Sequence, residues 1–178
     1  YATEFIYERL RVFLRDKGLS QSVIQAIYGA SKYTDILDDV NRIYALNDFM
    51  ENKKGKEFFS ILKRVRRIVS IEEKRDNKTI LPEPEKELFE LNEEKDLFKS
   101  YIKYSKITED LIVNKEYIQA METFSQVSSE LENFFENVQV NVKNTALRNN
   151  RLKLLAMIRG AFLNFADFSL IEAENEVK

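Results

Sequence analysis

The chain has 178 residues, a formal net charge of −2 and neither cysteine nor histidine. These absences exclude disulfides, zinc sites, Cys–His and Ser–His–Asp catalytic groups and imidazole bases from the chemistry of this chain. Its length fits one domain with a sizeable core, and 44% apolar with 33% charged residues is typical of a charge-rich helical protein.

The sequence shows no membrane or secretion signal. No apolar run approaches the ~20 residues that cross a bilayer, and the opening YATEFIYERL does not resemble a signal peptide. We therefore expect no membrane partner. The first residue is Tyr rather than Met, which suggests a piece of a longer protein, and residues 1–178 are expected to form a single domain.

Helical periodicity dominates the first half of the chain. Only four glycines and two prolines occur in total, too few for a many-stranded fold with tight turns. Helices are predicted over 2–17, where Gly18 ends the pattern, and over about 20–30. A third helix begins at Thr34 and a fourth covers about 55–75, each with apolar residues recurring by threes and fours.

A break separates these helices from the second half. Two prolines and alternating charges in RDNKTILPEPEKE predict a linker near 76–88, since proline cannot continue a helix. Residues 138–142, VQVNV, are predicted to be an extended connector, and Asn144 is a candidate cap for the helix that follows. The helices predicted in this half are 92–113, 115–136 and about 144–168. The expected fold class is all-α, a bundle of about seven helices.

Two segments are strongly basic on an acidic chain. Residues 53–67 hold seven Lys or Arg against the single acid Glu57, a net charge of +6. Residues 137–166 contain five Lys or Arg and no acid, a net charge of +5, so the rest of the chain carries −13. Local basic surfaces on an acidic body favour a polyanionic partner. A solvated helix face is the alternative interpretation.

The basic helix 55–75 has its cations opposite and beside an apolar stripe. Lys63 and Arg67 are one turn apart, and like charges at this spacing repel by about a few tenths of a kcal/mol unless an anion offsets them. Together with the second basic segment, this helix supplies the cations expected to hold RNA phosphates: Lys56, Lys63, Arg64, Arg66, Arg67, Lys143 and Arg148.

The last predicted helix distributes its cations differently. Arg151 projects into the middle of the apolar face, whereas Arg148 lies at its edge and Lys153 points outward. Because a buried arginine requires an anionic or carbonyl partner, Arg151 is expected to be a structural buried charge that ties helices together. Arg9 also falls toward the apolar side of the first helix, and the same role is expected for it.

Amide side chains crowd the connector and the start of the last helix. Amides can read base edges through paired donor and acceptor contacts, although each is also a common turn or capping residue. The amides in this stretch are Asn137, Gln139, Asn141, Asn144, Asn149 and Asn150. Of these, Asn137 and Asn141 are the predicted contacts to unstacked RNA bases.

The segment FFENVQVNVKNTALRNNRLKLLAMIRGAFLNFADFSLI, residues 134–171, closely resembles the end of the β subunit of bacterial tetrameric glycyl-tRNA synthetases. That family reads FFD-x-V-M-V-M, then LR-x-NRL-x-LL, and ends in ADFS or ADIS. The segments FIYERLRVFLRDKG, ILKRVRRIV and LPEPEKELF also resemble family segments, in the right order. The resemblance therefore covers essentially the whole chain.

This resemblance implies an α-helical anticodon-binding domain of the DALR type. By the same resemblance, the whole enzyme is an α2β2 cytoplasmic ligase that joins glycine to its tRNA using ATP and Mg²⁺, with catalysis in the α subunit. The chain itself is then expected to hold no catalytic site and no cofactor, and to bind the anticodon stem-loop of tRNA(Gly). Lys63 and Arg64 match the KR of one family motif, and Arg148, Asn150 and Arg151 match LR-x-NRL.

The sequence departs from the family pattern at several positions. Thr145 replaces the acid of the DALR tetrapeptide, Arg67 replaces an asparagine, and Gln139 and Asn141 replace two methionines of the connector. Two alternatives to the main hypothesis stay open. One is the corresponding domain of an arginyl-tRNA synthetase, and the other is a helical module for protein interaction or subunit assembly.

Overall fold

The computed structural model describes residues 2–31 and 35–171. This part of the chain contains eight α-helices, two short 3₁₀ turns and no strand, so the predicted all-α class is confirmed. The helices are α1 (Ala2–Asp16), α2 (Gln21–Ala30), α3 (Ile36–Glu51), α4 (Lys53–Asp76), α5 (Asn92–Val113), α6 (Tyr117–Phe124), α7 (Ser128–Asn137) and α8 (Thr145–Arg159). No helix in the described ranges is long and apolar enough to span a membrane.

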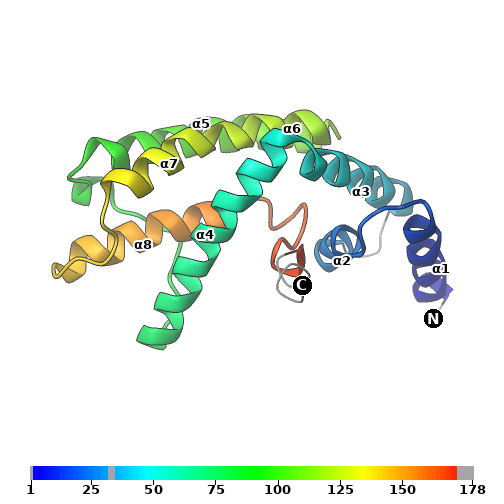
Figure 1. Cartoon of the computed structure of the whole chain (residues 1–178), viewed down its shortest axis with the longest axis horizontal. Helices are drawn as coiled ribbons and strands as arrows, with labels where there is room; N and C mark the ends of the chain where they lie inside the picture. Colours follow the sequence, from blue (N-terminus) through cyan, green and yellow to red (C-terminus); the bar gives the residue numbers. More distant parts are fainter. Residues whose placement is uncertain (1, 32–34, 172–178) are drawn as a thin grey trace.

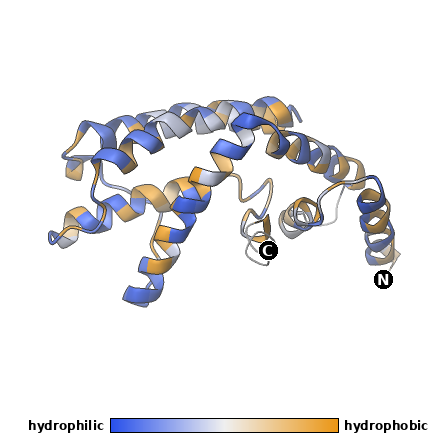
Figure 2. Ribbon diagram, in the orientation of Figure 1, coloured by the Kyte–Doolittle hydropathy of each residue, from blue (hydrophilic) through white to orange (hydrophobic). Residues whose placement is uncertain are grey.

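The helices form an elongated molecule in which α4 joins two ends. The long helix α5 runs antiparallel to α6 and α7 along one edge, while α8 lies beside α4 (Figure 1). Helices α1, α2 and α3 extend toward the opposite end (Figure 1). Hydrophilic and hydrophobic residues alternate along α4 (Figure 2), as expected for a helix with one buried side. This arrangement places both basic segments on neighbouring helices.

Aromatic side chains fill the centre of the molecule. Phe49, Phe58 and Phe124 are each about 1% exposed. The ring centroids of Phe58 and Phe124 are 6.0 Å apart in an edge-to-face arrangement, which joins α4 to α6. Edge-to-face pairs add about 0.5–1.5 kcal/mol beyond the burial of their area. Most phenylalanines therefore belong to the core.

The helix predicted over 115–136 is interrupted. A 3₁₀ turn, Ser125–Val127, separates α6 from α7. The Ser125 hydroxyl donates a hydrogen bond of 2.8 Å to the carbonyl of Glu122, a back-bond that bends helices. Burial of Phe124 and Val127 on the two sides of the turn holds the bend in place. The apolar periodicity continues through the turn, which is why the sequence alone predicted one helix.

The helix predicted to reach about residue 168 ends at Arg159. Phe162 has a φ of 66°, a left-handed conformation that an α-helix cannot continue through. The turn brings the Phe162 ring 4.8 Å from that of Phe124 and the Phe168 ring 5.2 Å from that of Phe59. Aromatic burial therefore redirects the chain back across α4 and α6.

The expected burial of Arg9 is wrong. Helix α1 buries Tyr7 and Leu14, so the side that faces the core differs from the side that the apolar pattern predicted. Arg9 is exposed, and its guanidinium carbon lies 5.3 Å from the centre of the Phe5 ring. Phe5 is itself 62% exposed, so this pair lies on the surface.

Candidate nucleic-acid interface

Arg151 lies in the buried face of α8, where the helix projection places it. Its side chain is 4% exposed, and its Nε donates a hydrogen bond of 2.9 Å to Oε1 of Glu94, a residue with no exposed surface. Its Nη1 donates at 2.8 Å to the carbonyl of Gln139 in the connector. Arg151 thus ties α8 to α5 and to the connector, and it offers nothing to a ligand.

Arg148, predicted to contact RNA phosphate, is also buried, with 9% of its surface exposed. Its guanidinium pairs with Glu72 and, at 2.8 Å, with Asp76, both on α4. Its Nε donates at 2.9 Å to Oδ1 of Asn141. The hydrogen bond from Arg148 lowers the pKa of Asp76 below its usual range. Protein groups occupy this arginine, so the expected phosphate contact is corrected to an internal ion pair.

The same network occupies Asn141, predicted to read RNA bases. Its amide nitrogen donates at 3.0 Å to Oε1 of Glu72, and its oxygen accepts from Arg148. Asn137 is exposed at the end of α7, where its amide donates to the carbonyl and side-chain oxygens of Asn133. The connector is therefore held by internal bonds, with Gln139 donating to the carbonyl of Asn141.

The remaining cations of α8 also meet acids. Arg159 binds Glu73 of α4 through two parallel hydrogen bonds of 2.7 and 2.9 Å, and this contact lowers the pKa of Glu73. Lys153 forms an ion pair of 2.9 Å with Glu85 of the linker. Acids from α4, α5 and the linker thus neutralise the acid-free segment. Lys143, exposed directly after the connector, is its one cation without an ion pair to another described residue.

Helix α4 shows the opposite arrangement. Within the described residues, no acid lies within ion-pair distance of five of its cations: Lys54, Lys56, Lys63, Arg64 and Arg67. Lys56, Arg64 and Arg67 are exposed, and Lys63 and Arg66 are partly buried. Lys53 makes a loose ion pair of 3.8 Å with Glu57, exposed on both sides. These five cations, spread over the first two thirds of α4, form a positive surface with no acidic partner among the described residues, called here the α4 basic face.

The α4 basic face has aromatic and apolar groups beside it. The guanidinium of Arg64 stacks over the ring of Phe135 of α7, with 4.1 Å between its carbon and the ring centre. Next to Lys56 and Lys63 lies a pocket of about 320 Å³, whose other lining residues are Met50, Phe59, Ser60, Phe168 and Ile171. Cations around an apolar surface suit single-stranded nucleic acid, which offers phosphates and unstacked bases together.

The start of α4 is built close against α3. The Asn52 side chain accepts a 2.7 Å hydrogen bond from the Gly55 amide and caps the helix. A β-carbon on Gly55 would lie 1.6 Å from the carbonyl oxygen of Phe49, so only glycine fits this corner. Lysines 53, 54 and 56 lie in and just after the first turn, where the helix dipole disfavours cations by about 0.3–1 kcal/mol each. Stability alone does not explain this placement.

Sequence reasoning missed two features of this region. Phe135 and the pocket aromatics were not singled out, because helical spacing does not show which aromatic residues lie beside an open surface. The acids that neutralise α8 were also missed, since Glu72, Glu73 and Glu94 lie at least 57 positions away in the chain. No group of three or more acidic, His or Cys side chains in the described part could hold a metal ion.

The chain is similar to known proteins along nearly its whole length. The model of the DALR anticodon binding domain matches residues 61–173. The chain is 32% identical over 168 residues to the glycine–tRNA ligase β subunit of Dinoroseobacter shibae, and 34% identical over 168 residues to that of Buchnera aphidicola subsp. Schizaphis graminum. Each alignment covers 94% of this chain and 23% of the relative, so the chain spans about a quarter of these relatives.

The matched residues contain the second half of α4, the helices α5 to α8 and the connector. They include Arg64 and Arg67 of the α4 basic face as well as the neutralised arginines of α8. With the all-helical fold and the match to more than half of its residues, the chain belongs to the family of DALR anticodon-binding domains.

Proposed function

We propose that this chain binds the anticodon stem-loop of tRNA(Gly) through the α4 basic face. The uncompensated charge of that face supports the proposal most directly, because five of its cations have no ion-pair partner among the described residues. Lys56, Lys63 and Arg67 would contact loop phosphates, which position the RNA without reading its sequence. Arg66 and Lys143, which follows the connector, extend the same basic surface in this proposal.

Base recognition in this proposal uses the groups beside the cations. The Arg64–Phe135 stack offers a planar surface for an unstacked base, and the pocket that Lys56 and Lys63 border offers an apolar one. Asn137, exposed at the end of α7, is retained as a base contact. Arg148 and Asn141 are left out because their polar groups bind one another and α4 acids.

The proposed context is the β subunit of a cytoplasmic glycine–tRNA ligase. The similarity to such subunits over 94% of this chain supports that context. In it, residues 1–178 act as one anticodon-binding domain. A partner α subunit, in an α2β2 enzyme, uses ATP and Mg²⁺ to attach glycine.

The test is the salt dependence of binding to a tRNA(Gly) anticodon stem-loop, beside the same stem-loop with its anticodon changed. Binding of the native loop should be tighter and should weaken steeply with salt. In Lys63→Ala/Arg67→Ala, the slope of log K against log salt should fall by about 1.4, since each phosphate contact to single-stranded RNA contributes ~0.7. The matched control is Lys103→Ala/Lys106→Ala on α5, which removes two exposed lysines outside the face.

The outcomes separate the candidate functions. An unchanged slope in Lys63→Ala/Arg67→Ala would remove the α4 basic face from the proposal. Binding that ignores the anticodon would reduce the domain to an electrostatic clamp. A preference for an arginine anticodon would favour the arginyl-tRNA synthetase alternative, and binding only to acidic proteins or to the α subunit would favour an interaction module.

A further inference from the structure

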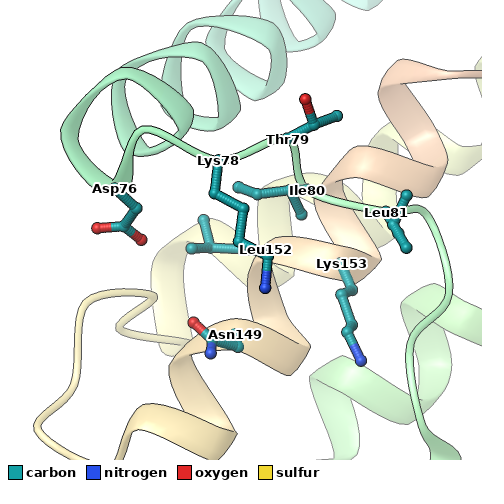
Figure 3. A pocket seen from close by; sticks show the side chains of 8 residues that line it. All are labelled: Asp76, Lys78, Thr79, Ile80, Leu81, Asn149, Leu152 and Lys153. Atoms are coloured by element: carbon teal, nitrogen blue, oxygen red, sulfur yellow. The ribbon is translucent and has the colours of Figure 1, made fainter.

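A second pocket lies between the chain after α4 and the side of α8. Its volume is about 160 Å³. The side chains that matter here converge from both segments (Figure 3): Asp76, Lys78, Ile80, Leu81, Asn149 and Leu152. At about 30 Å³ per water molecule, the space equals roughly five waters. It can take one ring system rather than a large ligand.

Apolar side chains line this pocket. Ile80 and Leu152 lie side by side in its interior (Figure 3), and Leu152 is 1% exposed. Leu81, which is 58% exposed, lies farther along the same segment, on the side away from Asp76 (Figure 3). A flat aromatic ring inserted here would pack against Ile80 and displace water from the pocket, which is favourable in proportion to the apolar area buried.

The polar groups of the pocket are oriented by Arg148. Its Nη1 donates at 2.8 Å to Oδ2 of Asp76 and at 3.2 Å to Oδ1 of Asn149. Because the Asn149 oxygen faces the guanidinium, its NH₂ group is left as a donor, and Oδ1 of Asp76 is left as an acceptor. Neither atom has a hydrogen-bond partner among the described residues. One fixed donor group therefore stands near one carboxylate, which only accepts hydrogen bonds.

The two lysines beside the pocket differ in whether an acid neutralises them. Lys78 is exposed and has no ion pair with any described residue, whereas Lys153 is engaged by Glu85 at 2.9 Å. Lys78 points into the same space as Asn149 (Figure 3). It is thus available to an anionic group attached to the ring, such as the phosphate of a nucleotide.

We propose that this pocket binds an unpaired guanine base. Guanine carries two neighbouring donors, N1–H and the N2 amino group, beside the acceptor O6 on its pairing edge. The Asp76 carboxylate can accept both donors, one at Oδ1 and one at the second lone pair of Oδ2, which also accepts from Arg148, while the Asn149 amide donates to O6. Adenine and cytosine present a single donor group there, and uracil presents one N–H between two acceptors, so each leaves a polar atom unmatched. Lys78 holds the phosphate.

The guanine can come from a loop of a bound RNA or from a free guanine nucleotide. The RNA source rests on the proposed function, but the base pocket itself does not. The pocket lies beyond the C-terminal end of α4, whereas the α4 basic face occupies the earlier turns. With a rise of 1.5 Å per residue, Arg67 and Asp76 are about 14 Å apart along the helix, a span of a few nucleotides.

The first experiment titrates the whole chain with GMP, AMP, CMP and UMP, followed by NMR signals of the Asn149 side-chain amide and the Ile80 and Leu152 methyl groups. GMP should shift these signals at concentrations about tenfold lower than the other nucleotides, as expected for a matched set of base contacts. Asn149→Ala should remove this preference while keeping the fold, because alanine is the best helix former. Equal shifts for all four nucleotides, or none, would overturn the proposal.

A second comparison tests the phosphate contact and the source of the guanine. Lys78→Ala should weaken binding of GMP but not of guanosine, and the matched control Lys74→Ala, an exposed lysine outside this pocket, should change neither. An RNA hairpin with one loop guanine should shift the same signals, and its adenine version should not. Shifts with GMP alone would overturn the RNA source and keep the pocket as a nucleotide site.

Discussion

Helices α4 and α8 carry similar positive charge and end in opposite environments. In α8, Arg148, Arg151 and Arg159 all contact carboxylates, and the first two are nearly inaccessible. In α4, Arg64 and Arg67 are exposed and meet no acid among the described residues. Arginines therefore stabilise the packing of α8 against its neighbours, whereas those of α4 are open to a ligand.

The difference arises from where the acids lie. Glu72 and Glu73 lie near the C-terminal end of α4, where they bind arginines of α8. Glu94 of α5 binds a third arginine of α8. Among the described residues, no such acid meets the five cations of the α4 basic face. A basic stretch of sequence therefore indicates a positive surface only when its cations are not paired with acids in the fold.

The largest effect is expected where a cation is most buried. Replacing Arg151 by alanine leaves Glu94 as an unpaired carboxylate with no exposed surface, and breaking a buried pair in this way costs about 3–5 kcal/mol. Urea denaturation should show this loss, while Lys143→Ala, directly after the connector, should stay within about 0.5 kcal/mol. A loss below 1 kcal/mol for Arg151→Ala would contradict the structural role assigned to α8.

The Arg159–Glu73 pair should give a smaller, pH-dependent effect. Its hydrogen bonds lower the pKa of Glu73, so the stabilisation is full above the usual glutamate pKa near 4.3 and is lost as pH falls through the lower folded value. Glu73→Gln should cost about 1–2 kcal/mol at pH 7. The gap between the variant and the unmodified chain should narrow as pH falls below the usual glutamate pKa, when thermal unfolding is followed across this range. A gap that is constant with pH would assign the effect to packing instead.

The caps of the two basic helices allow a balanced comparison. Asn52 and Asn144 each accept a hydrogen bond from the first turn, at 2.7 Å from Gly55 and 3.1 Å from Leu147. Changing either to alanine should cost about 1 kcal/mol in the free energy of unfolding. RNA binding at a permissive temperature should weaken only for Asn52→Ala, because that cap fixes the start of the α4 basic face. Equal RNA binding by both variants would show that the Asn52 cap does not position the α4 basic face.

The smallest effect should have the opposite sign. Lys63 and Arg67 repel at i,i+4 spacing, so Arg67→Ala is expected to leave stability unchanged or raise it by about a few tenths of a kcal/mol. RNA binding should weaken in the same variant. A clear loss of stability, seen as a lower Tm, would mean that Arg67 has a folding partner and does not serve a ligand.

The fold was largely predictable because its signals are local. The apolar periodicity of α3, α4 and α5 and the prolines of the linker located most elements within a few residues. The end of α8 was missed because it depends on the packing of Phe162 and Phe168 against aromatics far away in the chain. The break at Ser125 was missed because the apolar pattern runs through it.

The candidate site was predictable only in part. The exposed cations of α4 follow from one helix projection, since their own helix supplies the buried face. The fate of Arg148 and Asn141 does not, because it depends on Glu72 and Asp76, whose positions only the folded chain brings near. Arg151 was easier to place, since the middle of an apolar stripe is buried whichever helix covers it.

The pairing of α8 with the earlier helices bears on how the chain is made. Synthesis proceeds from the N-terminus, so the ribosome releases α4, the linker and α5 before the arginines that neutralise them. Until α8 emerges, Glu72, Glu73 and Glu94 lack their arginine partners and remain hydrated. Docking of that late helix is the step that makes these earlier segments stable together, so a ribosome stalled before residue 145 would hold a chain still open to water and to proteases.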